Sequence, residues 1–202
     1  MAETENEPLS LNWAAYHEAG HALVALLFGK TLRTISIVPE NELFGGGACY
    51  EDPHPLLLSQ AGVYCEDTIE HDRFICHQIM ITQAGEVAQT NFCPETVQAH
   101  HDRFDRQSAQ RYINKWSRNA RPDEKTDKLE DLYGCTREVM ARPDHAAAIH
   151  ALTNSLLERK EVKGAEATLI IRGAIKEAKT QAASSSKPLA NFKCPHCEAD
   201  YE

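Results

Sequence analysis

The segment LNWAAYHEAGHALVALLF, residues 11–28, decides the architecture of this chain. Apolar side chains recur in it at intervals of three and four residues, which predicts a mostly buried helix over about 12–28. Asn12 is a suitable N-cap for this helix, and Gly29 is a suitable C-terminal cap. Within the helix lies His17-Glu18-Ala19-Gly20-His21, which fits the pattern HExxH.

The HExxH pattern predicts a metal site with hydrolytic chemistry. Residues four apart lie on one face of a helix, so the imidazoles of His17 and His21 can bind one Zn²⁺ ion. Glu18 would lie beside the metal, where it could take a proton from a water activated by the metal. It is therefore the expected general base, and later the proton donor to the leaving amine. The competing interpretation is a helix with two incidental histidines.

A catalytic zinc site needs a third protein ligand and an open position for water. The extended pattern HExxHxxGxxH is excluded, because Val24 and Leu27 stand where it requires Gly and His. The remaining candidates are the His, Asp and Glu side chains further along the chain: Glu66, Glu70, His71, His77, Glu86, His100, His101, Asp102 and Asp105. Periodicity does not choose among them. The densest group, 100–105, equally fits a solvated helix start with Asp102 as its N-cap.

The rest of the sequence predicts a mainly α fold with a small β-sheet, an α+β class. A β-branched stretch at 31–39 predicts a strand ended by Pro39, and 44–50 predicts a turn leading into a second short strand. Helical patterns follow, with Lys163-Gly164 as a break before the last of them. The expected helices cover about 65–89, 102–117, 123–140, 144–160 and 165–179.

Composition narrows the classes of function. The chain has 202 residues and a net charge of −9. This charge argues against a nucleic-acid partner, which would need Lys and Arg gathered on one face. No signal peptide and no apolar run near the roughly 20 residues of a membrane span are visible, so we expect a soluble, cytoplasmic protein. The seven cysteines are an odd number and mostly scattered, which indicates reduced thiols.

Several segments, in order, resemble the FtsH-type zinc metallopeptidases. The closest match is 15–25, which resembles the active-site helix of that family. The weaker matches are 32–39, similar to its following strand; 81–89, similar to its Gly-Gly-Arg-x-Ala-Glu-Glu helix; 105–110, similar to its Asp-Leu-x-x-Ala-Thr segment; and 156–166, similar to its C-terminal segment. The resemblance implies an FtsH-like helical peptidase fold over about 11–179. It also implies that Asp105 is the third zinc ligand, with Asp102 as the alternative, and that 35–38 lies at the edge of the cleft, where an extended peptide could add as a strand.

The departures from the family shape the expected activity. Its members carry an ATPase module, whereas this sequence has no Gly-x-x-x-x-Gly-Lys-Ser/Thr phosphate loop. We therefore expect an ATP-independent zinc peptidase that acts on unfolded or flexible polypeptides. The alternatives are a catalytically weak binding or adaptor protein, or a peptidase subunit served by a separate ATPase chain. A homo-oligomer is compatible with each of these functions.

The chain divides into an acidic N-terminal extension (1–10), the peptidase domain (11–180) and a flexible tail (181–202). The tail contains Cys194-Pro195-His196-Cys197. Zinc binding there would need further ligands, and a redox motif would need a helix in a βαβ context. The third interpretation is a disordered tail with reactive thiols.

Overall fold

The computed structural model describes residues 7–38, 47–51, 69–97, 103–116, 119–184, 192–193 and 200–201. The described chain is mainly helical with a small antiparallel sheet, which confirms the predicted α+β class. The helices are α1 (Glu7–Leu27), α3 (Ile69–Phe92), α4 (Arg103–Lys115), α5 (Pro122–Ala141), α6 (Pro143–Arg159) and α7 (Gly164–Ser184), with a short 3-10 turn η1 (Pro94–Thr96). The strands are β1 (Thr31–Ser36), β2 (Gly47–Glu51), β3 (Glu161–Lys163), β4 (Phe192–Lys193) and β5 (Asp200–Tyr201).

Helix α1 carries the HExxH segment and begins earlier than predicted. It starts at Glu7, so Asn12 is an internal residue and its prediction as N-cap is wrong. An early start is physically reasonable, because proline is tolerated in a first helical turn and Pro8 occupies that turn. The predicted end is confirmed. Gly29 has φ +74°, its N–H donates to Leu26 O at 3.0 Å, and Lys30 N–H donates to Ala25 O at 2.9 Å, which is the Schellman arrangement.

Strand β1 lies in the middle of the three-stranded sheet, whose order is β2-β1-β3. Ile35 faces Ala48 of β2 on one side and Val162 of β3 on the other. The prediction that an extended peptide could add as a strand at 35–38 is therefore wrong for 35–36, where both sides of β1 are already paired. Strand β3 was not predicted, and it forms because Lys160 ends α6 with φ 67° and turns the chain back beside β1. The Ile37 N–H extends this pairing by donating to Lys160 O at 2.9 Å.

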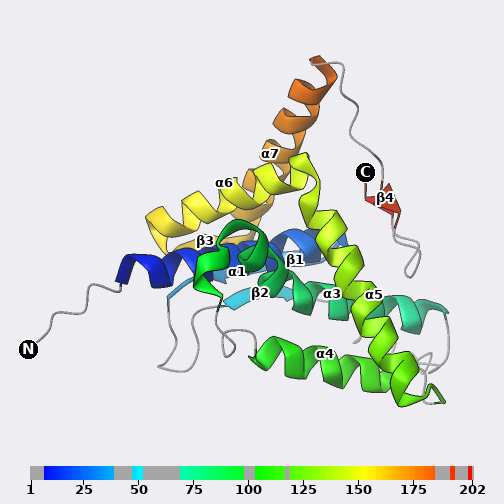
Figure 1. Ribbon diagram of the computed structural model, residues 1–202. Helices are drawn as coiled ribbons and strands as arrows, with labels where there is room; N and C mark the ends of the chain where they lie inside the picture. The colour runs from blue at the N-terminus through cyan, green and yellow to red at the C-terminus, as the bar shows by residue number, and fades with distance from the viewer. Residues whose placement is uncertain are drawn as a thin grey trace, which may run out of the picture.

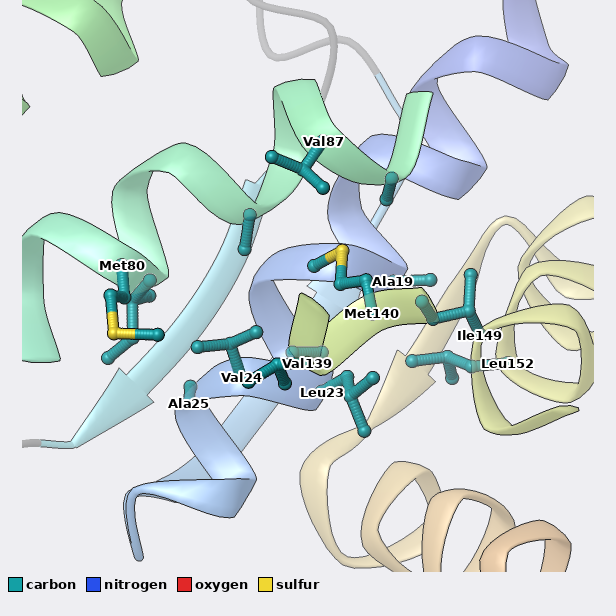
Figure 2. Close-up of a cluster of buried hydrophobic side chains, with 14 of the residues drawn as sticks. Ala19, Leu23, Val24, Ala25, Met80, Val87, Val139, Met140, Ile149 and Leu152 are labelled. Carbon is teal, nitrogen blue, oxygen red and sulfur yellow. The ribbon is translucent and has the colours of Figure 1, made fainter. Parts of the chain in front are cut away.

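Helix α1 runs through the middle of the molecule, with α6 and α7 on one side and α3 and α4 on the other (Figure 1). Its buried residues belong to one apolar core shared with the sheet and helices α3 to α7. Part of that core is drawn in Figure 2, where the labelled residues are Ala19, Leu23, Val24 and Ala25 of α1, Met80 and Val87 of α3, Val139 and Met140 of α5, and Ile149 and Leu152 of α6.

Helices α1 and α3 approach each other closely at Gly20. A Cβ atom at Gly20 would lie 2.4 Å from the carbonyl oxygen of Ala84 and 2.7 Å from the Cβ of Ala88. Such distances are shorter than van der Waals contact, so only glycine allows this approach. Because Gly20 lies between His17 and His21 in the sequence, the contact brings the backbone of α3 close to the part of α1 that carries both histidines.

In the C-terminal part of the chain the structure describes one helix and two short strands. Helix α7 continues to Ser184, which is consistent with the high helix propensity of Ala182 and Ala183. Beyond it, β4 pairs with β5 in antiparallel fashion. Cys194 and Cys197 lie between these strands but outside the described residues, so the interpretations of the Cys-x-x-Cys segment stay open. A search of the described helices finds none with the length and apolarity that a membrane crossing requires.

Candidate metal centre

Two elements far apart in the sequence bring three potential metal ligands together. His17 and His21 project from α1, and Asp105 lies in the first turn of α4. Asp105 Oδ2 is 2.9 Å from His17 Nε2 and 3.2 Å from His21 Nε2. One ligand atom from each residue lies within 4.8 Å of the other two. This group could hold a metal ion.

The structure separates Asp105 from the other described candidates for a third ligand. Glu70 is exposed on the first turn of α3, and His77 stacks on Phe28 with 3.8 Å between ring centroids. His71 contacts the Lys115 carbonyl at 3.3 Å, and Glu86 accepts a hydrogen bond from Arg106. The remaining candidates lie outside the described residues: Glu66, His100, His101 and Asp102. Among the described candidates, Asp105 alone joins the two histidines.

The two histidine rings are oriented in different ways. His21 Nδ1 is 2.7 Å from the carbonyl oxygen of Ile81, so this nitrogen carries a hydrogen, and Nε2 is the atom that can bind a metal once its own proton is lost. His17 Nδ1 is buried and has no hydrogen-bond partner within the described part of the chain. Its ring instead packs edge-on against Trp13, with 5.9 Å between centroids. On the Nδ1 side, a hydrogen bond therefore fixes the His21 ring, and packing against Trp13 fixes the His17 ring.

Gly85 of α3 leaves the space in which the donor atoms meet. A Cβ atom at this position would lie 2.5 Å from His17 Nε2 and 2.5 Å from His21 Nε2. Only a residue without a side chain therefore lets both rings come this close to α3 with their Nε2 atoms directed at one point. The sequence reasoning did not assign a role to Gly85. The available signal was a glycine inside a helical pattern, where it costs about 1 kcal/mol relative to alanine.

Glu18 is a buried carboxyl group beside these donors. Its side chain accepts a hydrogen bond from the backbone of Ala48 in β2. Its Oε2 atom has no hydrogen-bond partner among the residues that the structure describes. Burial raises the pKa of Glu18, and the nearby charges of His21 and His17 offset this only in part. A carboxyl group with a raised pKa and one free oxygen is suited to accepting and returning a proton.

Without a metal, the donors form a coupled ionic cluster. Burial lowers the pKa of His21, but the charge of Asp105 and the hydrogen bonds to Asp105 and Ile81 outweigh it and raise the value to about 9. Burial likewise raises the pKa of Asp105, but the charge of His21 and the hydrogen bonds from both histidines hold it well below its usual range. At neutral pH the metal-free site therefore contains a His21 cation paired with the Asp105 anion.

Metal binding is expected to strengthen as the pH rises from about 6.5 to about 8.5, because the ion must displace the proton on His21. With a His21 pKa of about 9, this single proton predicts a rise of roughly tenfold in apparent affinity per pH unit. Protonation of His21 also stabilises the metal-free fold. This stabilisation is complete below pH 6.5, the ordinary pKa of histidine, and it decreases as the pH rises through about 9. Competition with a zinc-binding dye between about pH 6.5 and 8.5 measures how the zinc affinity changes with pH. A zinc affinity that does not depend on pH would contradict the prediction.

A scan against protein-family models and a search of the curated proteins gave no match. The interpretation of this centre therefore depends on its own donor set, the close approach of both histidine rings to Gly85 and the buried carboxyl group of Glu18.

Proposed function

We propose that this chain is an FtsH-type, zinc-dependent peptidase that hydrolyses peptide bonds in unfolded or flexible polypeptides without ATP. His17, His21 and Asp105 would hold the zinc ion, and Glu18 would act as general base. The observation that carries the proposal is the convergence of three donors, from α1 and α4, beside a buried carboxyl group with a raised pKa.

The donor set suits zinc. Two imidazoles and one carboxylate, with a position left for water, form a common catalytic zinc site. The same donor set also suits non-haem Fe²⁺. The spacing of His17 and His21 on one helix, with Glu18 next to the first histidine, favours zinc and hydrolysis. Metal analysis of the purified protein distinguishes the two ions.

In this proposal Glu18 moves the protons of the reaction. When bound, zinc supplies Lewis acidity and lowers the pKa of a water molecule. Glu18 accepts a proton from the water as the water oxygen attacks the peptide carbonyl carbon. It then gives that proton to the leaving nitrogen as the carbon–nitrogen bond breaks. The hydrogen bond from Ala48 keeps one end of the carboxyl group in place, and the unpaired Oε2 is available for the transfer.

The outer edge of β2 is the surface best placed to align a peptide. β2 is the outer strand of the described sheet, and on its other side no described strand pairs with it. The contact between Ala48 and Glu18 places this strand directly beside the proposed base. An extended segment that adds to β2 would bring its own backbone to Glu18. Only a polypeptide that can unfold locally offers such a segment, which accounts for the proposed substrate class.

The proposal is tested with purified protein, unfolded casein and defined metal content. We expect one zinc ion per chain and cleavage that a chelator stops, that added zinc restores and that ATP does not change. Bound zinc without chelator-sensitive cleavage of several unfolded substrates would instead favour a metal-containing binding or adaptor protein. Cleavage that appears only when a separate ATPase chain is added would favour a peptidase subunit.

A further inference from the structure

The helix that supplies Asp105 has little apolar anchoring near that residue. Its buried residues are Ala109 and Ile113, which lie one and two turns beyond Asp105. Phe104, which directly precedes Asp105, is 48% exposed. Apolar burial therefore holds the middle of α4 against the protein but does not by itself fix its first turn. A polar contact of this turn with a neighbouring helix can add to the hydrogen bonds by which His17 and His21 hold the Asp105 carboxylate.

An ion pair between α3 and α4 lies at the required place. Arg106 Nη2 donates to Glu86 Oε1 at 2.8 Å. Glu86 directly follows Gly85, whose missing side chain leaves space at the donor nitrogens, and Arg106 directly follows Asp105. The pair therefore ties α4 to α3 within one residue of the points at which both helices meet the centre.

Helix α5 also faces this ion pair. The pKa of Tyr133 is raised by burial and then by the charge of Glu86, while Arg106 and Arg137 act in the opposite direction. Tyr133 also interacts with Thr90, one turn after Glu86 on α3. Glu86 thus lies where three helices meet, and its side chain is only 20% exposed. Arg106 is 61% exposed, so Glu86 is the better-packed end of the pair and the guanidinium reaches it from the surface.

We propose that Glu86 is a positioning residue, which through Arg106 holds the first turn of α4 so that Asp105 reaches both histidines. This inference assumes the metal site of the proposed function. A partly exposed ion pair contributes only about 0–1 kcal/mol to stability, so little of its effect should appear in unfolding experiments. Removing a group that orients a metal ligand typically lowers metal affinity by about 10- to 100-fold.

The Arg106→Gln variant separates positioning from simple electrostatics. Removing a positive charge next to a cation site should raise zinc affinity if charge alone matters. We expect the opposite, a fall of about tenfold or more, because Asp105 loses its fixed position. Glu86→Gln should show a similar fall, and the loss in the double variant should be smaller than the sum of the two single losses, because both single variants lose the Arg106–Glu86 interaction. Arg159→Gln, which breaks the Arg159–Glu166 ion pair of α6 and α7, is the matched control and should leave zinc affinity unchanged.

Zinc affinity is measured by chelator competition, together with urea unfolding of the metal-free proteins. The ring nitrogen chemical shifts of His17 and His21, recorded without metal, provide a second readout and should change in both single variants. Unchanged or increased zinc affinity of Arg106→Gln, or additive losses in the double variant, would overturn the proposal. If the wild-type chain binds no zinc, the proposed function fails, and the histidine shifts alone then decide the role of Glu86.

Discussion

Replacement of Glu18 by glutamine is expected to lower kcat for unfolded casein by a factor on the order of 100 or more, while the bound zinc stays at about one ion per chain. The amide has nearly the shape of the carboxyl group and can still accept the hydrogen bond from Ala48. It cannot take a proton from water or return one to the leaving nitrogen. The reaction thus loses its general base while the site keeps its geometry.

Zinc should remain because Glu18 is not one of the three converging donors. Stability should also change little, because burial already disfavours the charged form of this side chain. Glu130→Gln, at an exposed position of α5, is the control for the same chemical change away from the centre. Undiminished cleavage by Glu18→Gln would exclude Glu18 as the base. Loss of zinc would instead show that the carboxylate supports metal binding.

The features that depend on neighbouring residues were predictable from the sequence. The α1 periodicity and the positive-φ glycine that ends α1 are local, and the structure confirms both. The positions of α4 and α5 agree with the predicted ranges to within two residues at each end. The pairing of His17 with His21 is also local, since a helix places residues four apart on one face.

The features that depend on residues far apart in the sequence were harder to predict. Strand β3 has three residues, too few for a pattern, and exists because β1 offers it a partner. This long-range pairing is also why the prediction that a peptide strand could add beside 35–36 is wrong. Asp105 lies 88 positions after His17, and no periodicity relates the two. Only the family resemblance selected it among nine candidates.

Replacement of Gly85 by alanine is expected to lower zinc affinity by a factor on the order of 100, the upper end of what displaced ligands usually cost. The added methyl group would lie 2.5 Å from the Nε2 atoms of both His17 and His21. Carbon normally keeps about 3.5 Å from such atoms, so the rings must turn away or α3 must move. Neither change is local, because a hydrogen bond to Ile81 holds the His21 ring and the close contact at Gly20 holds α3.

The unfolding free energy of the metal-free Gly85→Ala protein distinguishes loss of the metal site from loss of the fold. Overpacking costs typically 1–3 kcal/mol, and alanine in place of a helical glycine returns about 1 kcal/mol of helix propensity, so the metal-free Gly85→Ala protein should still fold. Gly134→Ala in α5 is the matched control, because its Cβ atom would meet nothing within 4 Å. That variant should gain about 0.5–1 kcal/mol in urea unfolding and keep its zinc affinity. Zinc binding by Gly85→Ala at the wild-type level would mean that the ion is not held where these two nitrogens and Asp105 converge.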